Sequence, residues 1–310
     1  MSTIKRIFLF VAVNLLVILA ISIVIQIVGV EPYLTRGGIN YRALLTFCAI
    51  FGFVGSFISL QLSRFMAKHA LGVVLIDPQA PGGAAESRLV ETVTRICQRA
   101  GLNPLPEIGI YPSREVNAFA TGPSRSRSLV AVSSGLLDRM DDKAVEGVLA
   151  HEVSHIVNGD MVTMTLLQGV ANTFVMFAAR VAVFAIDSFL RSRDDEGKGL
   201  GYFAQYLLIM LFETALMLLA MIVVYYFSRR REFAADNGSA ELAGRETMIH
   251  ALESLQDHKD AVDRSQPSLA TLKIHGGARG MVALLFSSHP PIEARIAALR
   301  NQEPLQRLTP

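Results

Sequence analysis

Five consecutive residues, His151-Glu152-Val153-Ser154-His155, have the types and spacing of a hydrolytic metal site. On a helix, two histidines four residues apart lie on one face, so both imidazoles can bind one metal ion. Zinc takes nitrogen ligands at this spacing, and hydrolysis needs a carboxylate beside the attacking water. The pattern therefore predicts a zinc hydrolase in which His151 and His155 are ligands and Glu152 is the general base.

The five-residue pattern leaves a metal ion one protein ligand short. The extended pattern of the metzincin class needs a glycine at position 158 and a histidine at position 161, and this chain has Asn158 and Met161. A glutamate on a later helix is the alternative. Glu232 is the strongest candidate, because it lies five residues after one long apolar run and His155 lies six residues before another. If both runs cross a membrane as a hairpin, both residues return to the same side.

Glu232 has a second interpretation, as a solvated acid that stabilises the start of a soluble helix through its dipole. Its position opposite the histidine pattern favours the role of ligand. Asp236 lies four residues further on and shares a helical face with Glu232. A carboxylate there could accept a hydrogen bond from a ligand histidine and fix its tautomer.

Composition limits the class of protein. Of 310 residues, 51% are hydrophobic and 18% are charged, which is too apolar for an ordinary soluble protein. The net charge of +2 gives no strongly basic surface, so we expect no nucleic-acid partner. Cys48 and Cys97 predict no disulfide framework, because Cys48 lies within an apolar run. Reduced thiols suit a domain that works in the cytosol.

Four apolar runs are each long enough to cross a lipid bilayer as a helix. The first is too long for a cleaved signal peptide, so it is expected to stay in the membrane. The runs pair into two hairpins that alternate with two soluble segments, the first with the histidine pattern and the second with Glu232. The runs cover residues 7–30, 43–62, 161–190 and 203–227, and the four segments are 1–68, 69–160, 161–227 and 228–310.

The soluble segments show the patterns of helices and short strands. Asp141 or Asp142 is expected to cap the helix that carries the histidine pattern, and Gly159 to end it. Gly244 could break the helix that carries Glu232. The expected helices are 84–100, 142–159, 231–258 and 292–300, the strands are 107–111 and 128–132, and a polar loop (259–280) precedes a short apolar stretch (281–286).

Two charged residues lie inside the second hairpin. Arg180 and Glu213 fall at similar depth if the hairpin turns near residue 196. Burying either charge alone would be costly, so the two are expected to pair. The alternative is a tilted or covered hairpin in which each charge is solvated.

The charges beside the apolar runs favour an active site on the cytoplasmic side. Seven Lys and Arg residues flank the runs on the side of the histidine pattern and of both termini, against five on the other side.

Four segments, taken together and in order, resemble the M48 family of membrane zinc metalloproteases, and in particular its bacterial heat-shock members. They are residues 117–122 (NAFATG), 151–160 (HEVSHIVNGD), 228–236 (SRRREFAAD) and 288–291 (SHPP). The resemblance implies a mainly α membrane protein of the bacterial inner membrane. Its expected fold has four transmembrane helices and an α+β zincin (gluzincin-like) metalloprotease domain.

The resemblance also implies roles for single residues. His151, His155 and Glu232 would bind one Zn²⁺ per chain, with Glu152 as general base and Asp236 behind the ligands. Three further residues match positions that act on the substrate or support the site, and each has a simpler interpretation. Asn117 would hold the substrate backbone or only form a turn, His289 would stabilise the oxyanion or only precede a turn, and Arg295 would support the site or be a solvated helix residue.

The expected reaction is hydrolysis of peptide bonds in misfolded membrane proteins or unfolded polypeptides, as quality control under stress. One alternative is a processing peptidase with a single membrane substrate. Another is a membrane adaptor whose metal site is only structural. Glu152 argues against the adaptor, because a structural zinc needs no base beside it. The oligomeric state stays open.

Overall fold

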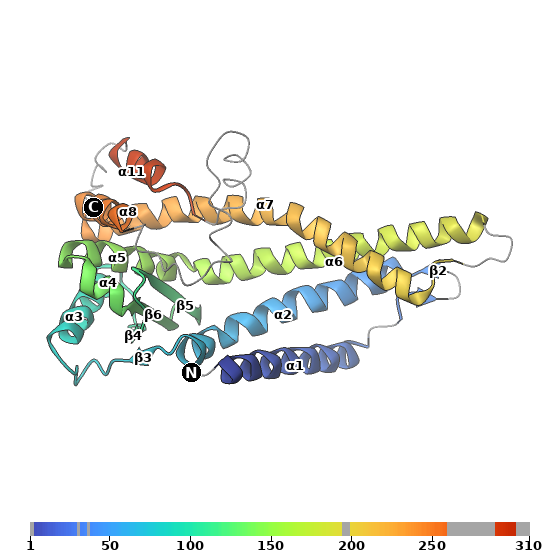
Figure 1. The fold of residues 1–310 in the computed structure, drawn as a ribbon, viewed down its shortest axis with the longest axis horizontal. Coiled ribbons are helices and arrows are strands. Elements are labelled where there is room, and N and C mark those ends of the chain that lie inside the picture. The colour runs from blue at the N-terminus through green and yellow to red at the C-terminus, as the bar shows by residue number, and fades with distance from the viewer. Residues whose placement is uncertain (1–2, 30–31, 36–37, 194–198, 259–288, 302–310) are drawn as a thin grey trace. The chain divides into compact units, whose positions relative to one another are not determined.

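A computed structural model describes residues 3–29, 32–35, 38–193, 199–258 and 289–301. The expected loop at 259–280 and the apolar stretch at 281–286 lie outside these residues. The chain forms two compact units that alternate along the sequence (Figure 1). Unit 1 comprises Met1–Leu60 and Thr163–Val224, and unit 2 comprises Gln61–Val162 and Tyr225–Pro310.

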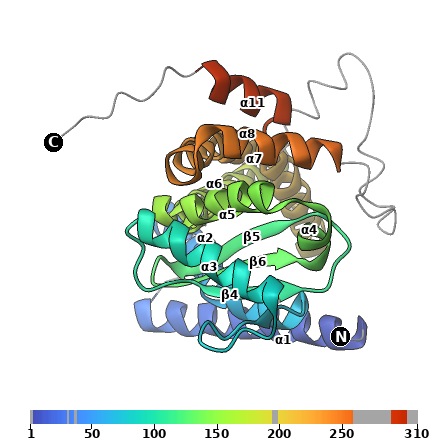
Figure 2. The ribbon, with the colours of Figure 1, turned by 90° about the vertical axis from the view of Figure 1, so that its left-hand side faces the viewer.

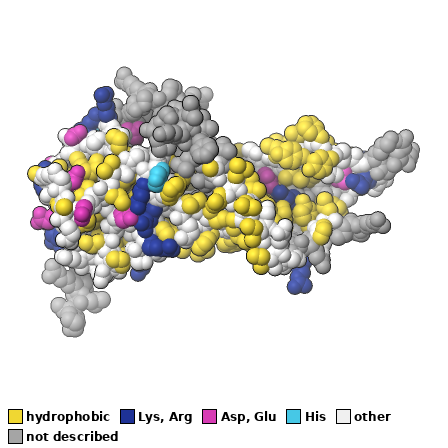
Figure 3. All heavy atoms as spheres, turned by 90° about the horizontal axis from the view of Figure 1, so that it is seen from below, with side chains coloured by type: hydrophobic (Ala, Val, Ile, Leu, Met, Phe, Trp, Pro, Cys, Tyr) yellow, Lys and Arg dark blue, Asp and Glu magenta, His cyan; other side chains and the backbone are white. Residues whose placement is uncertain are grey.

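Unit 1 is built from the apolar helices. The long helices α2 (Tyr41–Ala70), α6 (Asp160–Arg193) and α7 (Tyr202–Ala243) are each long and apolar enough to span a membrane. Helix α1 (Thr3–Val28) has a shorter described apolar stretch, Leu15–Val28, so a fourth span remains a prediction. Most large exposed hydrophobic side chains belong to these four helices. Figure 3 shows the hydrophobic side chains that are visible from one side of the molecule. Lipid can cover such a surface.

The expected ion pair in unit 1 is confirmed. Arg180 Nη1 donates to Glu213 Oε1 at 2.5 Å and to the Met176 carbonyl at 3.0 Å. The guanidinium also lies over the ring of Phe47, at 5.8 Å from its centroid. The pair joins α6 to α7 within their apolar parts. A short antiparallel pair, β1 (Leu34–Thr35) and β2 (Gly38–Ile39), precedes α2.

Unit 2 contains a four-stranded mixed sheet with the order β3-β4-β6-β5. Strands β4 and β6 are parallel, and the other neighbours are antiparallel. The expected strands at 107–111 and 128–132 are present, and residues 118–124 between them form a further strand that was not predicted. The strands are β3 (Val74–Leu75), β4 (Glu107–Tyr111), β5 (Ala118–Ser124) and β6 (Arg127–Ser133).

Helices cover both faces of this sheet. Helices α3 (Ala84–Arg99) and α5 (Asp142–Asn158) pack on one face, where Ile108, Val130 and Val132 join the main core (Figure 2). The last turns of α2 pack on the other face through Ala67. Three further helices are α4 (Ser134–Arg139), α8 (Arg245–Asp257) and α11 (Ile292–Asn301), and α8 packs against both α5 and α11.

The ends of α5 follow from capping residues. Asp141 is the N-cap and accepts a hydrogen bond from the Ala144 amide at 2.8 Å. Gly159 ends the helix with φ +69°, a left-handed conformation that favours glycine. The next residue, Asp160, already begins α6. The histidine pattern therefore lies just before the chain turns into a long apolar helix.

The expectation of a separate helix beginning at residue 231 is wrong. Helix α7 continues unbroken through the arginines at 229–231 and ends at Ala243, so the possible break at Gly244 is confirmed. The arginines mark the end of the apolar surface, which is not the end of the helix. Both cysteines are buried and free, as expected.

Candidate active site

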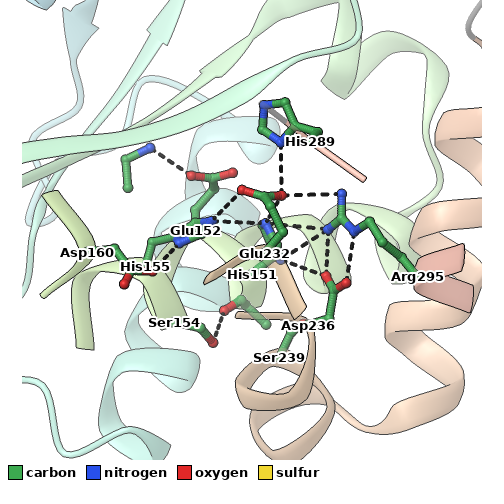
Figure 4. Close-up of polar contacts among 12 residues, drawn as sticks. His151, Glu152, Ser154, His155, Asp160, Glu232, Asp236, Ser239, His289 and Arg295 are labelled. Carbon is green, nitrogen blue, oxygen red and sulfur yellow. Dashed lines mark hydrogen bonds and ion pairs between the residues drawn. The ribbon is translucent and has the colours of Figure 1, made fainter. Parts of the chain in front are cut away.

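Three side chains of unit 2 converge on one point. His151 and His155 come from α5, and Glu232 comes from α7 (Figure 4). One potential ligand atom from each lies within 4.8 Å of the other two. The two imidazole Nε2 atoms are 3.1 Å apart, and each is 3.5 Å from an oxygen of Glu232.

The far side of each imidazole faces its own carboxylate. His151 Nδ1 lies 3.0 Å from Asp236 Oδ1, and His155 Nδ1 lies 2.6 Å from Asp160 Oδ2. A carboxylate can only accept a hydrogen bond, so each neutral imidazole carries its proton on Nδ1. Both Nε2 lone pairs then face each other and Glu232. Three convergent electron-pair donors fit a bound cation, and two imidazoles with one carboxylate suit zinc.

The electrostatics of His155 agree with a site for positive charge. Burial would lower the pKa of this imidazole, but hydrogen bonds to Asp160 and Glu232 and the nearby charge of Glu152 raise it to about 9. The surrounding carboxylates thus favour a cation between them.

Close packing between α5 and α7 places Glu232. Ser239 Oγ donates to the Gly147 carbonyl at 3.0 Å, and a Cβ at Gly238 would lie 2.8 Å from Ser154 Oγ. Small residues therefore let the two helices approach closely. Glu232 is only 3% exposed, so a solvated acid at this position is ruled out.

Arg295, on α11, is buried next to the ligands. Its Nε lies 2.8 Å from Asp236 Oδ2, its Nη2 lies 2.5 Å from Asp236 Oδ1, and its Nη1 lies 3.5 Å from Glu232 Oε2. A bidentate pair of this kind fixes the carboxylate that orients His151. Arg295 is therefore not a solvated helix residue.

Glu152 faces the edge of the sheet. It follows His151 on α5, and its Oε2 accepts a hydrogen bond from the Ala120 amide of β5 at 2.8 Å. The carboxylate thus lies between the metal-binding side chains and an edge strand, where a peptide could bind.

The two remaining expected residues lie at the rim. His289 is exposed, and its Nδ1 is 2.9 Å from Glu232 Oε2. Asn117 is exposed and directly precedes β5. Its backbone N–H donates to Ser133 Oγ, and its backbone carbonyl accepts from the Ser133 N–H. The structure brings His289 to the ligand cluster, while Asn117 lies at the start of the edge strand, three residues before Ala120.

Sequence reasoning missed two residues of the site, Asp160 and Arg231. Asp160 orients His155, and Arg231 Nη1 donates to the Asp160 carbonyl at 2.6 Å. For Asp160 the sequence did contain a signal. It is an acidic residue directly after the helix-ending Gly159, and it begins the next helix about one turn after the ligand His155. The arginine next to Glu232 gave no such signal, since it resembles a charge at a membrane border.

Comparisons with known proteins agree with this geometry. Residues 84–303 match the profile of Peptidase family M48. The chain is 51% identical to the Protease HtpX homolog of Bacillus licheniformis, over 95% of this chain and 98% of that protein. It is also 51% identical to Protease HtpX of Shewanella denitrificans, over 96% and 99%.

The fold is similar to a solved structure as well. The crystal structure of Ste24p from S. mikatae matches 96% of this chain with a TM-score of 0.63 and 19% identity. The chain spans 64% of the length of that protein, so this likeness concerns the fold. The family match and the relatives together show that the chain belongs to peptidase family M48, as a homologue of the HtpX proteases.

Proposed function

We propose that this M48 metallopeptidase is a zinc endopeptidase that hydrolyses membrane proteins and unfolded polypeptides. The observation that carries the proposal is the convergence of His151, His155 and Glu232, with Glu152 beside them and facing an edge strand. Structural zinc sites usually close with four protein ligands. Among the described residues, three ligands converge here, which leaves a position for water and substrate.

The side chains divide the work of hydrolysis. Zinc held by the three ligands would polarise the scissile carbonyl and acidify the attacking water. Glu152 takes the proton of that water and passes it to the leaving amine. The Ala120 amide holds the carboxylate of Glu152 at the edge strand, where the reacting bond must lie.

Substrate binding is assigned to the rim of the site. An extended peptide can add to the outer edge of β5, and the exposed Asn117, directly before this strand, is assigned to the peptide backbone. His289 is assigned to the carbonyl oxygen, because its exposed ring lies next to Glu232. A donor in this role typically contributes about 100-fold or more to the rate. Arg295 supports the site by fixing Asp236.

The substrates and the side of the membrane follow from the helices. The helices that are long and apolar enough to span a bilayer support a membrane location, and an enzyme there could act on membrane proteins. The excess of flanking Lys and Arg residues, seven against five, supports a site on the cytoplasmic side. We assign it to quality control of damaged proteins in the bacterial inner membrane, the role that the resemblance of its sequence motifs implies.

Purified protein in detergent, supplied with zinc and an unfolded protein, tests this function. We expect Glu152→Gln to bind zinc normally and to cleave at least about 100-fold more slowly than the wild type, because the proton acceptor is lost. Glu146→Gln is the matched control, since Glu146 lies on the same helix and pairs with Arg95 at 3.2 Å, away from the metal ligands. Cleavage by Glu152→Gln at the wild-type rate would refute the assignment.

A further inference from the structure

Strand β5 connects the candidate active site with the point where α2 leaves the membrane. At Ala120 the strand bonds to Glu152. Four residues later it ends at Ser124, and the turn into β6 brings Arg127 Nη2 to 3.2 Å from Gln61 Oε1. Gln61 lies beside the end of the apolar run at residue 62. One short strand therefore spans the distance from the proton acceptor to the membrane border.

Further contacts hold this end of the sheet on α2. Glu107 begins β4 opposite Leu129 of β6, so it lies at the same end as the β5–β6 turn. Its carboxylate pairs with Arg64 at 2.7 Å and with Lys68 at 2.8 Å, both on the last turns of α2. Ala67 packs against the adjoining sheet face. All these residues belong to unit 2, so the distance from the border to the site is fixed within one compact body.

The outer edge of β5 is suited to guide an extended chain. Strand β5 is last in the sheet order, and the Ala120 amide donates to Glu152, away from its partner Val130 on β6. Groups on an antiparallel strand alternate in direction, so the Ala118 backbone faces the same side. The last strand of a sheet can bind an added strand along its unpaired side.

The length of the strand sets a distance. Four residues of strand cover about 13 Å at roughly 3.3 Å per residue. The register shifts between Thr121 and Ser124, and Gly122 has φ +141° with no room for a Cβ beside the Arg127 carbonyl, so the strand bends near its tip. A substrate that emerges from the bilayer beside α2 thus needs about four extended residues to reach Glu152.

We propose that β5 acts as a ruler for substrates that emerge beside α2, so that the enzyme cleaves these membrane proteins only at bonds about four or more residues beyond the end of the membrane-spanning segment. This inference rests on the proposed function and adds a rule for its substrates. Bonds nearer the membrane cannot reach Glu152 unless the spanning segment is pulled out of the bilayer, which costs free energy for each apolar residue exposed.

A series of single-span substrates in lipid vesicles with the full-length enzyme tests the ruler. The scissile bond of one cleavable segment is placed 2, 4, 6, 8 or 12 residues from the spanning helix, after the helix in one set and before it in the other. We expect spacers of six or more residues to be cut at one common rate. A spacer of two residues should be cut at least about tenfold more slowly, because the bond cannot align with Glu152.

The same cleavable segment, made as a soluble peptide without a spanning helix, distinguishes a failure of the ruler from a failure of the proposed function. The wild type should cut it and Glu152→Gln should not. If the segment resists the wild type, the proposed function itself fails. If the segment is cut while two-residue and eight-residue spacers react equally fast in both sets, the ruler is refuted and the function stands.

Discussion

Asp160 Oδ2 lies 2.6 Å from His155 Nδ1, while the other ring nitrogen of His155 faces Glu232. The left-handed turn at Gly159 makes this contact possible, because it folds the first residue of α6 back onto the preceding turn of α5. Arg231 holds the Asp160 carbonyl from α7. His155 is thus oriented by Asp160, which begins α6 and is held in place by Arg231 of α7.

Removal of this carboxylate should weaken metal binding. We expect Asp160→Ala to lower the zinc affinity about 10–100-fold, since His155 loses the acceptor that fixes its tautomer. Asp160→Asn can still accept the Nδ1 proton through its amide oxygen and should lose less. Competition with a chelator measures the dissociation constant. Asp142→Ala is the control, because Asp142 is exposed near the start of α5. An unchanged affinity in Asp160→Ala would show that the contact has no role in binding.

The ion pair in unit 1 predicts a charge-swap result. Arg180→Glu or Glu213→Arg alone should each destabilise the folded protein by about 3–5 kcal/mol, because each leaves like charges in apolar surroundings. The double variant restores opposite charges and should recover most of the loss. Denaturant unfolding in detergent measures the change in the free energy of unfolding. Arg193→Glu, at the exposed end of α6, controls for charge alone. No recovery in the double variant would mean that the pair does not stabilise the helices.

The cap of α5 predicts a pH dependence of stability. Hydrogen bonds from the Ala144 amide and from His250 lower the pKa of Asp141 in the folded protein. A carboxyl whose pKa is lower when folded stabilises at pH above its ordinary value, and this contribution disappears as pH falls through the folded-state pKa. Asp141→Ala should therefore cost about 0.5–2 kcal/mol at neutral pH and much less in acid. Unfolding curves between pH 2 and pH 7 check this, with Asp142→Ala as the reference, and a difference that stays constant with pH would contradict it.

Much of the fold could be predicted because its signals are local. Asp141 and Gly159 mark the ends of α5, and the apolar runs mark the long helices. Strand β5 was missed because residues 118–124 contain a glycine, a proline and small side chains, with no alternating apolar pattern. Its structure depends on long-range pairing with β6, which a single segment does not reveal.

Local sequence patterns likewise predict some residues of the candidate site, while others depend on contacts between distant segments. His151, Glu152 and His155 are set by one helical repeat, and Glu232 follows from the return of a hairpin to its starting side. Asp160 depends on one left-handed residue and on a contact with a helix 71 positions away. No periodic pattern predicts such a contact, because it exists only once the helices have packed.

The metal content of variants at Glu232 tests the central claim most directly. In a Glu152→Gln background, which lacks the proposed general base, we expect one zinc ion per chain by mass spectrometry of the purified protein. Adding Glu232→Ala should reduce this to less than about a tenth, because only two protein ligands remain. Glu241→Ala, on the same helix and exposed, should keep full zinc. Full occupancy without Glu232, or no zinc in the parent protein, would contradict the account.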